Sequence, residues 1–213
     1  MKEFESIYKN NIEAQINEEL VPRPDSRFLE MESFALEKKI PILSPSSGVV
    51  LKYLTQIYKP KKILELGTGL GYSTAWMISG NRNSEITTID RNLREIKRAD
   101  VYLKTIYPET RIDFVNEWCL AYLERNEDFF EYDFCFIDCD KITYPKILET
   151  LSVKTKKGTI LVFDNVLWHA RIFSDEFVKP SDMAMKEFWK QLKLKTSEYT
   201  IFAAADGLVL LVN

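Results

Sequence analysis

Two apolar runs of the sequence each end in acidic residues. The run FCFI is followed by Asp138, Asp140 and Lys141, and the run TILVF is followed by Asp164 and Asn165. In an open parallel sheet, the carboxyl ends of the strands lie on one edge, where ligands bind. If these two strands are neighbours, Asp138, Asp164 and Asn165 present three oxygen ligands together. Such a set suits a hard divalent ion such as Mg²⁺ and would offset the repulsion between two close carboxylates.

Each acidic strand end also has a purely structural interpretation. Asp138 and Asp140 could cap a following helix, and Asp164 with Asn165 could form an Asx turn. Lys141 could accept a proton from a substrate hydroxyl, although an exposed lysine is the default. Each structural interpretation is common alone, but their joint occurrence with the glycine loop described next favours a functional site.

The segment ILELGTGLGYS leads from a strand into a helix through glycines at 67, 69 and 71. This spacing differs from the G-x-G-x-x-G dinucleotide fingerprint, but it allows a tight turn and a close approach of a ligand to the backbone. Glu65 ends the strand and faces the loop. The next apolar run ends in Asp90, where an acid can accept hydrogen bonds from two ribose hydroxyls. The alternative, a glycine-rich surface turn, does not explain Asp90.

The elements that must position these residues alternate along the chain from Lys61. We expect strands at Ile63–Leu66, Ile86–Ile89, Ile112–Val115, Phe134–Ile137 and Thr159–Phe163. We expect helices at Tyr72–Ser79, Leu93–Ile106, Trp118–Arg125, Tyr144–Leu151 and Met183–Leu194. Strands that are apolar on both faces and alternate with helices indicate a parallel sheet covered by helices. The last two runs, Thr200–Ala203 and Leu208–Val212, flank a turn signal and predict a hairpin.

The first 45 residues predict a helical extension of a single domain that spans residues 1–213. Ile7, Ile12, Ile16 and Leu20 have a helical spacing. Asp25 or Ser26 could cap a second helix that runs to about Lys39, and Ser46 could cap a third. The apolar surface of these helices predicts either a homodimer or a lid over the site.

The bulk composition is that of an ordinary globular protein, with 46% hydrophobic and 29% charged residues and a net charge of −3. This charge argues against a general nucleic-acid coat. Three cysteines do not suggest a disulfide framework, so we expect a cytoplasmic protein. No apolar stretch has the length of a membrane span, and the N-terminus lacks a signal-peptide core, so no membrane partner is expected.

The motif ELGTGLGYS followed by ITTID resembles the S-adenosylmethionine motif of class I methyltransferases. Together with FIDCDK and FDNVLW, it is similar to the cation-dependent O-methyltransferase family, which includes catechol and caffeoyl-CoA O-methyltransferases. The resemblance covers about residues 42–212. It implies an α/β, Rossmann-like methyltransferase fold with a seven-stranded, mostly parallel sheet, an antiparallel C-terminal hairpin strand and helices on both faces.

The resemblance also implies site residues. The cofactors would be S-adenosylmethionine and a divalent cation, Mg²⁺ with Mn²⁺ or Ca²⁺ as alternatives, held by Asp138, Asp164 and Asn165. Lys141 would be catalytic together with Asp138. The expected cofactor-binding residues are Glu65, Gly67, Thr68, Gly69, Gly71, Ser73, Asp90, Cys119 and Asp138. The expected substrate contacts are Asp140, Lys141 and His169, and for His169 an exposed loop position carries equal weight.

One segment departs from the family pattern. Family members usually carry a glycine and then small residues beside the adenine, where this chain has Asn116-Glu117-Trp118-Cys119. Trp118 could stack on adenine or pack in the core, and we favour packing. For Cys135 and Cys139 we favour a packing role over thiolate chemistry.

The resemblance leaves two substrate classes open. A small catechol-like phenol is favoured. The alternative is a tRNA wobble 5-hydroxyuridine, because LVPRPD and IPILSP are similar to a bacterial branch that includes such a tRNA methyltransferase, and because the C-terminal third is locally basic. That basic character could equally be a solvated helix face. A dehydrogenase-like nucleotide-binding module is an alternative of another class, against which the glycine spacing and the acidic strand ends argue.

Overall fold

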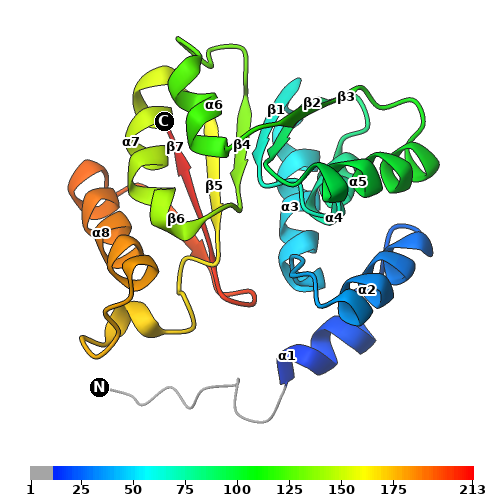
Figure 1. The fold of residues 1–213 in the computed structure, drawn as a ribbon, viewed down its shortest axis with the longest axis horizontal. Coiled ribbons are helices and arrows are strands. Elements are labelled where there is room, and N and C mark those ends of the chain that lie inside the picture. Colours follow the sequence, from blue (N-terminus) through cyan, green and yellow to red (C-terminus); the bar gives the residue numbers. More distant parts are fainter. Residues whose placement is uncertain (1–11) are drawn as a thin grey trace.

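A seven-stranded sheet forms the centre of the computed structural model, which describes residues 12–213. The strand order is β3-β2-β1-β4-β5-β7-β6 (Figure 1). The strands are β1 (Lys62–Leu66), β2 (Glu85–Asp90), β3 (Ile112–Asn116), β4 (Phe134–Ile137), β5 (Ile160–Asp164), β6 (Tyr199–Phe202) and β7 (Leu208–Val212). Strands β1 to β5 pair in parallel, whereas β7 runs antiparallel to both β5 and β6. The predicted fold class, including the C-terminal hairpin, is therefore confirmed.

Helices cover both faces of this sheet (Figure 1). One face carries α3 (Pro45–Tyr58), α4 (Tyr72–Gly80) and α5 (Leu93–Ile106), and the other carries α6 (Cys119–Arg125), α7 (Tyr144–Lys154) and α8 (Pro180–Lys195). Short 3₁₀ turns precede α7 (Lys141–Thr143) and α8 (Arg171–Phe173). The predicted helices are all present, with ends that differ by a few residues.

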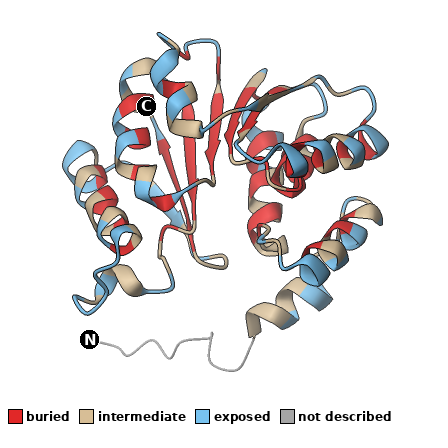
Figure 2. Cartoon of the chain, in the orientation of Figure 1, coloured by how far each residue is buried: buried red, intermediate tan, exposed pale blue. Residues whose placement is uncertain are grey.

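The two helical layers bury alternate residues of the same strands, which is why the strands are apolar on both faces. Ile63 and Phe134 pack on the side of Trp76, whereas Leu64 and Cys135 pack on the side of Tyr144. All of these side chains are buried. Figure 2 shows the central strands of the sheet coloured as buried. Because both faces are occupied by helices, the ends of the parallel strands are where polar residues of the sheet can reach a ligand.

The N-terminal extension is helical over its described part, where it comprises α1 (Ile12–Gln15), a π-helical turn (Ile16–Leu20) and α2 (Arg27–Lys38). Ile7 lies outside the described residues. Arg23 pairs with Glu32 at 2.8 Å, and Glu32 in turn accepts a hydrogen bond from Tyr72 on α4. This chain of contacts fastens the extension beside the mouth of the site.

The prediction that Ser46 caps the third helix is wrong. The N-cap lies two residues earlier: helix α3 begins at Pro45, and Ser44 is the N-cap whose hydroxyl accepts the Ser47 N–H at 3.2 Å. Proline suits this first position because its missing N–H would have no partner within the helix. Within the described part of the chain, no helix is both long and apolar enough to span a membrane.

Candidate active site

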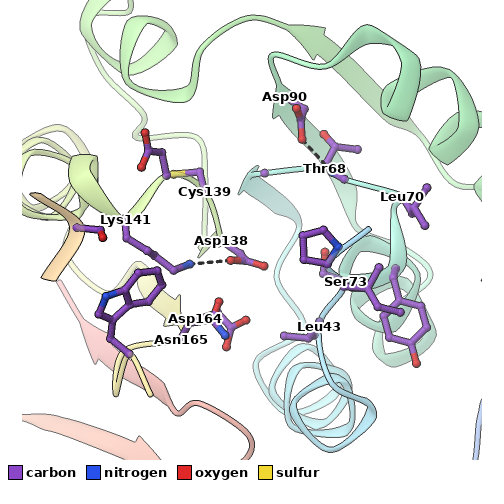
Figure 3. Close-up of a pocket in the computed structure, with 18 of the residues that line it drawn as sticks. Leu43, Thr68, Leu70, Ser73, Asp90, Asp138, Cys139, Lys141, Asp164 and Asn165 are labelled. Atoms are coloured by element: carbon purple, nitrogen blue, oxygen red, sulfur yellow. Dashed lines mark hydrogen bonds and ion pairs between the residues drawn. The ribbon is translucent and has the colours of Figure 1, made fainter. Parts of the chain in front are cut away.

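The strand order changes direction between β1 and β4, and the candidate site lies at the carboxyl ends of these two strands. From β1 the chain continues outward to β2 and β3, and from β4 it continues to β5 on the other side. Such a switch point leaves a crevice between diverging loops. A cavity of about 600 Å³ opens here (Figure 3). Its walls include residues from the glycine loop, both acidic strand ends, the segment 41–43 and the loop after β5.

The glycine loop forms one wall of this cavity. Gly67 has a φ of 109°, and a Cβ added there would lie 2.0 Å from the carbonyl oxygen of Asp138. No other residue fits this position without moving the backbone of the loop after β4. The Gly69 N–H donates to Asp90 Oδ2 at 2.9 Å. Thr68 and Ser73 also line the cavity, whereas Gly71 lies behind it against α5.

Glu65 is fully buried beneath the loop, and the cavity walls do not include it. Its carboxylate accepts hydrogen bonds from the hydroxyls of Ser73, Thr74 and Thr88, each at 2.6 Å. Burial raises the pKa of Glu65 to about 7, against the opposing effect of the three hydroxyl donors. The side chain therefore ties the start of α4 to β1 and β2, and it supports the loop from below.

Asp90 ends β2 and is held by two backbone donors. Besides the Gly69 N–H, the Asn92 N–H donates to Asp90 Oδ1 at 2.8 Å. A second lobe of the crevice, about 320 Å³, extends past Asp90 toward Cys119 and Trp118. Gly67, Gly69 and Asp90 thus line both lobes of the crevice, in the position that was predicted for the cofactor.

The preference for Trp118 in the core is wrong. Its side chain is 57% exposed and lies at the edge of the second lobe, with the Arg91 guanidinium 4.2 Å from its ring centre. Cys119, next in sequence, is half-buried and donates its thiol toward the Ile89 carbonyl at 3.6 Å. A hydrogen bond with Cys139 and burial raise the pKa of the Cys119 thiol, so it stays neutral. The structure therefore gives no support to thiolate chemistry here.

The acidic strand ends meet across β4 and β5, which pair in parallel. Asp164 is the last residue of β5 and is 2% exposed, and its Oδ1 atom has no hydrogen-bond partner within the described residues. Burial and the nearby Asp138 carboxylate hold the pKa of Asp164 well above its usual range. Asn165 follows in the left-handed region with a φ of 54°. A buried carboxylate oxygen without a partner is costly, and a cation would satisfy it.

The donor set fits a hard divalent cation. Asp138, Asp164 and Asn165 all line the cavity and offer two carboxylates and an amide (Figure 3). Among the described residues, no group of three or more His, Cys, Asp or Glu side chains could hold a metal ion by itself. A cation at this place would therefore depend on the Asn165 amide as well as on the carboxylates.

Lys141 lies in the 3₁₀ turn after β4 and points back to the strand ends, with only 7% of its surface exposed. Its Nζ atom donates to Asp138 Oδ1 at 2.8 Å (Figure 3) and to the Tyr144 hydroxyl at 2.7 Å. The default expectation of an exposed lysine therefore does not hold. Buried between a carboxylate and a phenol, the amine is fixed at the floor of the cavity.

Sequence reasoning missed Tyr144. This residue is fully buried, and its hydroxyl lies 2.9 Å from the carbonyl oxygen of Ile137 and 3.0 Å from that of Asp164. Burial raises the pKa of Tyr144, so its hydroxyl keeps its proton and donates to one of these carbonyls at a time. The available signal was its position three residues after Lys141, which places the two side chains on the same side of a helical turn.

The remaining predicted contacts lie at the rim. Asp140 lines the cavity and also caps the 3₁₀ turn, because its Oδ1 accepts the Ile142 N–H at 3.2 Å. His169 lines the cavity from an exposed loop. Trp168 and Leu43 complete the apolar part of the wall and were not predicted. The cavity thus brings together the predicted metal ligands, Lys141 and the glycine loop.

The geometry agrees with the comparisons to known proteins. A profile of the O-methyltransferase family matches residues 16–213. The chain is 30% identical over 153 residues to a caffeoyl-CoA O-methyltransferase of Stellaria longipes, an alignment that spans 68% of this chain and 62% of that protein. It is 25% identical over 184 residues to a catechol O-methyltransferase of Niastella koreensis, which spans 84% and 83% respectively. The crystal structure of an O-methyltransferase from Bacillus cereus in complex with SAH has a TM-score of 0.80 at 24% identity, and covers 94% of this chain and 96% of that chain.

The Rossmann-like sheet with a crevice at its switch point is the architecture expected of a class I methyltransferase, and the profile match over residues 16–213 shows the family. The chain belongs to the O-methyltransferase family. It is an S-adenosylmethionine-dependent O-methyltransferase whose relatives include caffeoyl-CoA and catechol O-methyltransferases. The family assignment and the enzyme class are thereby confirmed, and the dehydrogenase alternative is not favoured.

Proposed function

We propose that this enzyme methylates a hydroxyl of a small catechol-like phenol with the assistance of a divalent cation, Mg²⁺ first among the candidates. The observation that carries the proposal is the buried Asp164 Oδ1, for which residues 12–213 offer no hydrogen-bond partner, beside Asp138 and Asn165 at the floor of a cavity that Lys141 also lines. The similarity to a catechol O-methyltransferase supports the substrate class. Two carboxylates that face one cavity are a suitable site for a cation that binds neighbouring oxygens of a substrate.

The glycine loop and Asp90 would hold the methyl donor. The half-buried backbone at Gly67 and Gly69 lines the cavity and would let a ligand lie against the loop, and Asp90 would accept hydrogen bonds from ribose hydroxyls. The Bacillus cereus relative was solved with SAH bound, which supports the same ligand class here. Because the sulfonium donor is already activated, the chain must mainly orient it toward the oxygen of the acceptor.

Asp138, Asp164 and Asn165 would hold the cation, which would supply Lewis-acid chemistry and lower the pKa of an acceptor hydroxyl. Lys141 is the candidate base, and its neutral amine would take the hydroxyl proton on Nζ. The two contacts that Lys141 Nζ donates, to Asp138 and to Tyr144, would then hold the resulting ammonium. Trp168 and Leu43 would exclude water from one side of an aromatic acceptor.

The basic residues that suggested tRNA are largely engaged within the protein. Lys154 donates to the backbone carbonyls of Leu123 and Asn126, and Lys156 pairs with Asp133 at 2.7 Å. Lys186 donates to the Phe177 carbonyl at 3.1 Å. These contacts support a solvated and internally paired surface over a continuous track for phosphates.

The decisive experiment is an activity screen with labelled S-adenosylmethionine, run with and without EDTA, against a panel of catechols and against undermodified tRNA. We expect methylation of catechols that EDTA abolishes and that added Mg²⁺ restores. Methylation that is insensitive to EDTA would remove the cation from the proposal. Methylation of tRNA but of no catechol, with salt-dependent tRNA binding, would replace the proposed acceptor by the RNA alternative.

The homodimer is a separate proposal. The exposed Leu20, Leu29 and Leu36 on the N-terminal helices supply the apolar surface for it. Removal of residues 1–24, which takes away Leu20, followed by mass measurement in solution tests the first part of this surface, and an unchanged oligomeric state would contradict a dimer through residues 1–24.

A further inference from the structure

The wall of the cavity opposite the glycine loop contains a backbone conformation that its side chains disfavour. Trp168, His169 and Ala170 follow one another with φ values of 51°, 53° and 60°. Residues with a Cβ rarely adopt this left-handed region, and a run of them is rarer still. None of the three is a glycine or an asparagine, so surrounding contacts must impose the conformation. We call residues 168–170 the left-handed turn.

One fully buried carboxylate, that of Asp182, accepts a hydrogen bond from this turn and fixes it to α8. Asp182 is 0% exposed, and its Oδ1 accepts the indole N–H of Trp168 at 2.8 Å. Its Oδ2 accepts the guanidinium of Arg171 at 2.8 Å and the backbone N–H of Lys179 at 3.0 Å. All three partners are donors. The carboxylate therefore joins the left-handed turn, the residue after it and the start of α8 in one buried network.

The hairpin turn between β6 and β7 holds the same segment from the other side. Asp206 Oδ1 accepts the His169 N–H at 2.6 Å, and the backbone of Leu167 donates to the Asp206 carbonyl at 2.9 Å. Trp168, His169 and Ser181 at the start of α8 all line the main cavity. The turn is thus fixed between two elements, and its fixed face is a wall of the cavity.

We propose that Asp182 is a positioning residue for the acceptor: it sets the place of the Trp168 indole in the cavity wall and thereby the affinity for the phenol. The inference rests on the proposed function for the identity of the acceptor. Asp182 touches neither the acceptor nor the methyl donor, since the cavity walls do not include it. Its effect passes through the Trp168 N–H···Oδ1 hydrogen bond and the Arg171 ion pair.

The test compares Asp182→Asn with Trp168→Phe. Asparagine keeps the volume of the side chain, but its NH₂ group must face at least one of three donors, so the network is broken. Phenylalanine keeps an aromatic ring and lacks the indole N–H. Asp175→Asn is the matched control, because Asp175 is a fully exposed acid in the same loop region.

With a catechol acceptor, we expect KM to rise about tenfold in Asp182→Asn and in Trp168→Phe, with kcat and the Kd for S-adenosylhomocysteine changed by less than about twofold. The double variant should show no further rise, because both changes break the same contact. An unchanged acceptor KM in a folded Asp182→Asn protein, additive effects in the double variant, or a parallel loss of S-adenosylhomocysteine affinity would overturn the proposal.

A second measurement needs no acceptor. Acrylamide quenching of fluorescence is measured for each protein and for the same protein with Trp168→Phe added. The difference between the two measurements isolates the signal of Trp168. We expect this quenching to increase in Asp182→Asn and not in Asp175→Asn. If wild-type enzyme methylates no catechol while this quenching increases, the proposed acceptor class fails and the positioning of Trp168 by Asp182 stands. If the quenching is unchanged, the positioning role is overturned whatever the acceptor.

Discussion

The two walls of the crevice are built in different ways. The donor side is the wall that we propose to hold the methyl donor. Its glycine loop and Asp90 come from consecutive segments, and both carboxylate oxygens of Glu65 accept hydrogen bonds from hydroxyls. On the acceptor side, Asp164 Oδ1 has no hydrogen-bond partner in the described part of the chain, and the turn 168–170 is left-handed. The Glu65 carboxylate beneath one wall is fully hydrogen-bonded, whereas the other wall combines a buried carboxylate oxygen that has no partner among the described residues with backbone strain.

This difference has a physical explanation. A methyl donor that is common to a whole enzyme family can be bound by a preformed loop whose backbone groups are already oriented. In the proposed function, the acceptor side must leave oxygen ligands free for a cation and for a substrate, and free ligands in a buried site destabilise the empty protein. The left-handed residues Asn165 and 168–170, together with Asp164 Oδ1, therefore lie where the chemistry is proposed to occur.

The largest expected effect comes from Asp164→Asn. We expect kcat/KM to fall by at least about 10³-fold, because a proposed cation ligand is lost, while the Kd for S-adenosylhomocysteine stays within about threefold of wild type. In the metal-free protein, we expect a higher Tm, because burial and Asp138 both disfavour the Asp164 carboxylate.

Asp113→Asn, an exposed acid on β3, is the control and should change neither activity nor Tm. A metal-free Asp164→Asn protein that melts at a lower temperature than wild type would contradict the view that this carboxylate is held at a cost in stability.

Lys141→Ala should have the next largest effect. We expect kcat to fall by about 10²- to 10³-fold, the range for loss of a general base, with unchanged affinity for S-adenosylhomocysteine. Lys146→Ala removes an exposed lysine of the following helix and serves as the control. Steady-state kinetics with saturating cation measure the effect, and an unchanged turnover rate in Lys141→Ala would remove this residue from the mechanism.

The same difference explains how much of each wall could be predicted from the sequence. The donor wall is made of local motifs, so ELGTGLGYS and Asp90 indicated it directly. The alternation of apolar runs with helices indicated the parallel sheet, and the family resemblance added its seven strands. The acidic ends at Asp138 and Asp164 were also visible, because each directly follows an apolar run. Tyr144, Trp168 and Asp182 were not predicted as site residues, because their roles depend on contacts between β4, β5, α8 and the hairpin turn that no local pattern encodes.

Trp118 shows the limit of residue type as a guide. A tryptophan next to a strand end is usually packed in a core, yet here it is exposed and pairs with Arg91. Its environment is set by the path of the loop between β3 and α6, which the sequence did not define.

Glu65→Gln tests whether the hydrogen bonds to the Glu65 carboxylate compensate for its burial beneath the donor wall. Because the folded-state pKa of Glu65 is raised from 4.5 to about 7, the folded state binds more protons than the unfolded state between these values. Its contribution to stability is therefore complete below about pH 4.5 and is lost as the pH rises through 7. The shift corresponds to a change on the order of 3 kcal/mol over this window.

Urea unfolding of both proteins across this pH window measures the effect. We expect the free energy of unfolding of wild type to decrease with rising pH relative to that of Glu65→Gln. Equal pH dependence in the two proteins would mean that the hydroxyl donors compensate fully for burial, which would make the contrast between the walls sharper still.

The smallest expected effect is a gain in stability from Ala170→Gly. Alanine at a φ of 60° pays a steric penalty of about 1–2 kcal/mol, from which glycine is free. Glycine is also more flexible in the unfolded state, so we expect a net stabilisation of about 1 kcal/mol or slightly less. Ala170 is exposed, and the substitution removes no hydrogen bond of its side chain.

Ala184→Gly, inside α8, is the opposite control and should destabilise the protein by about 0.5–1 kcal/mol. Chemical denaturation of both variants would separate the two cases. A stabilised Ala170→Gly enzyme with a higher acceptor KM would show that the strain in the left-handed turn serves substrate binding, since relief of the strain would loosen the wall. A destabilised Ala170→Gly protein would show that the turn is not strained, and the contrast with the donor wall would then depend on Asp164 alone.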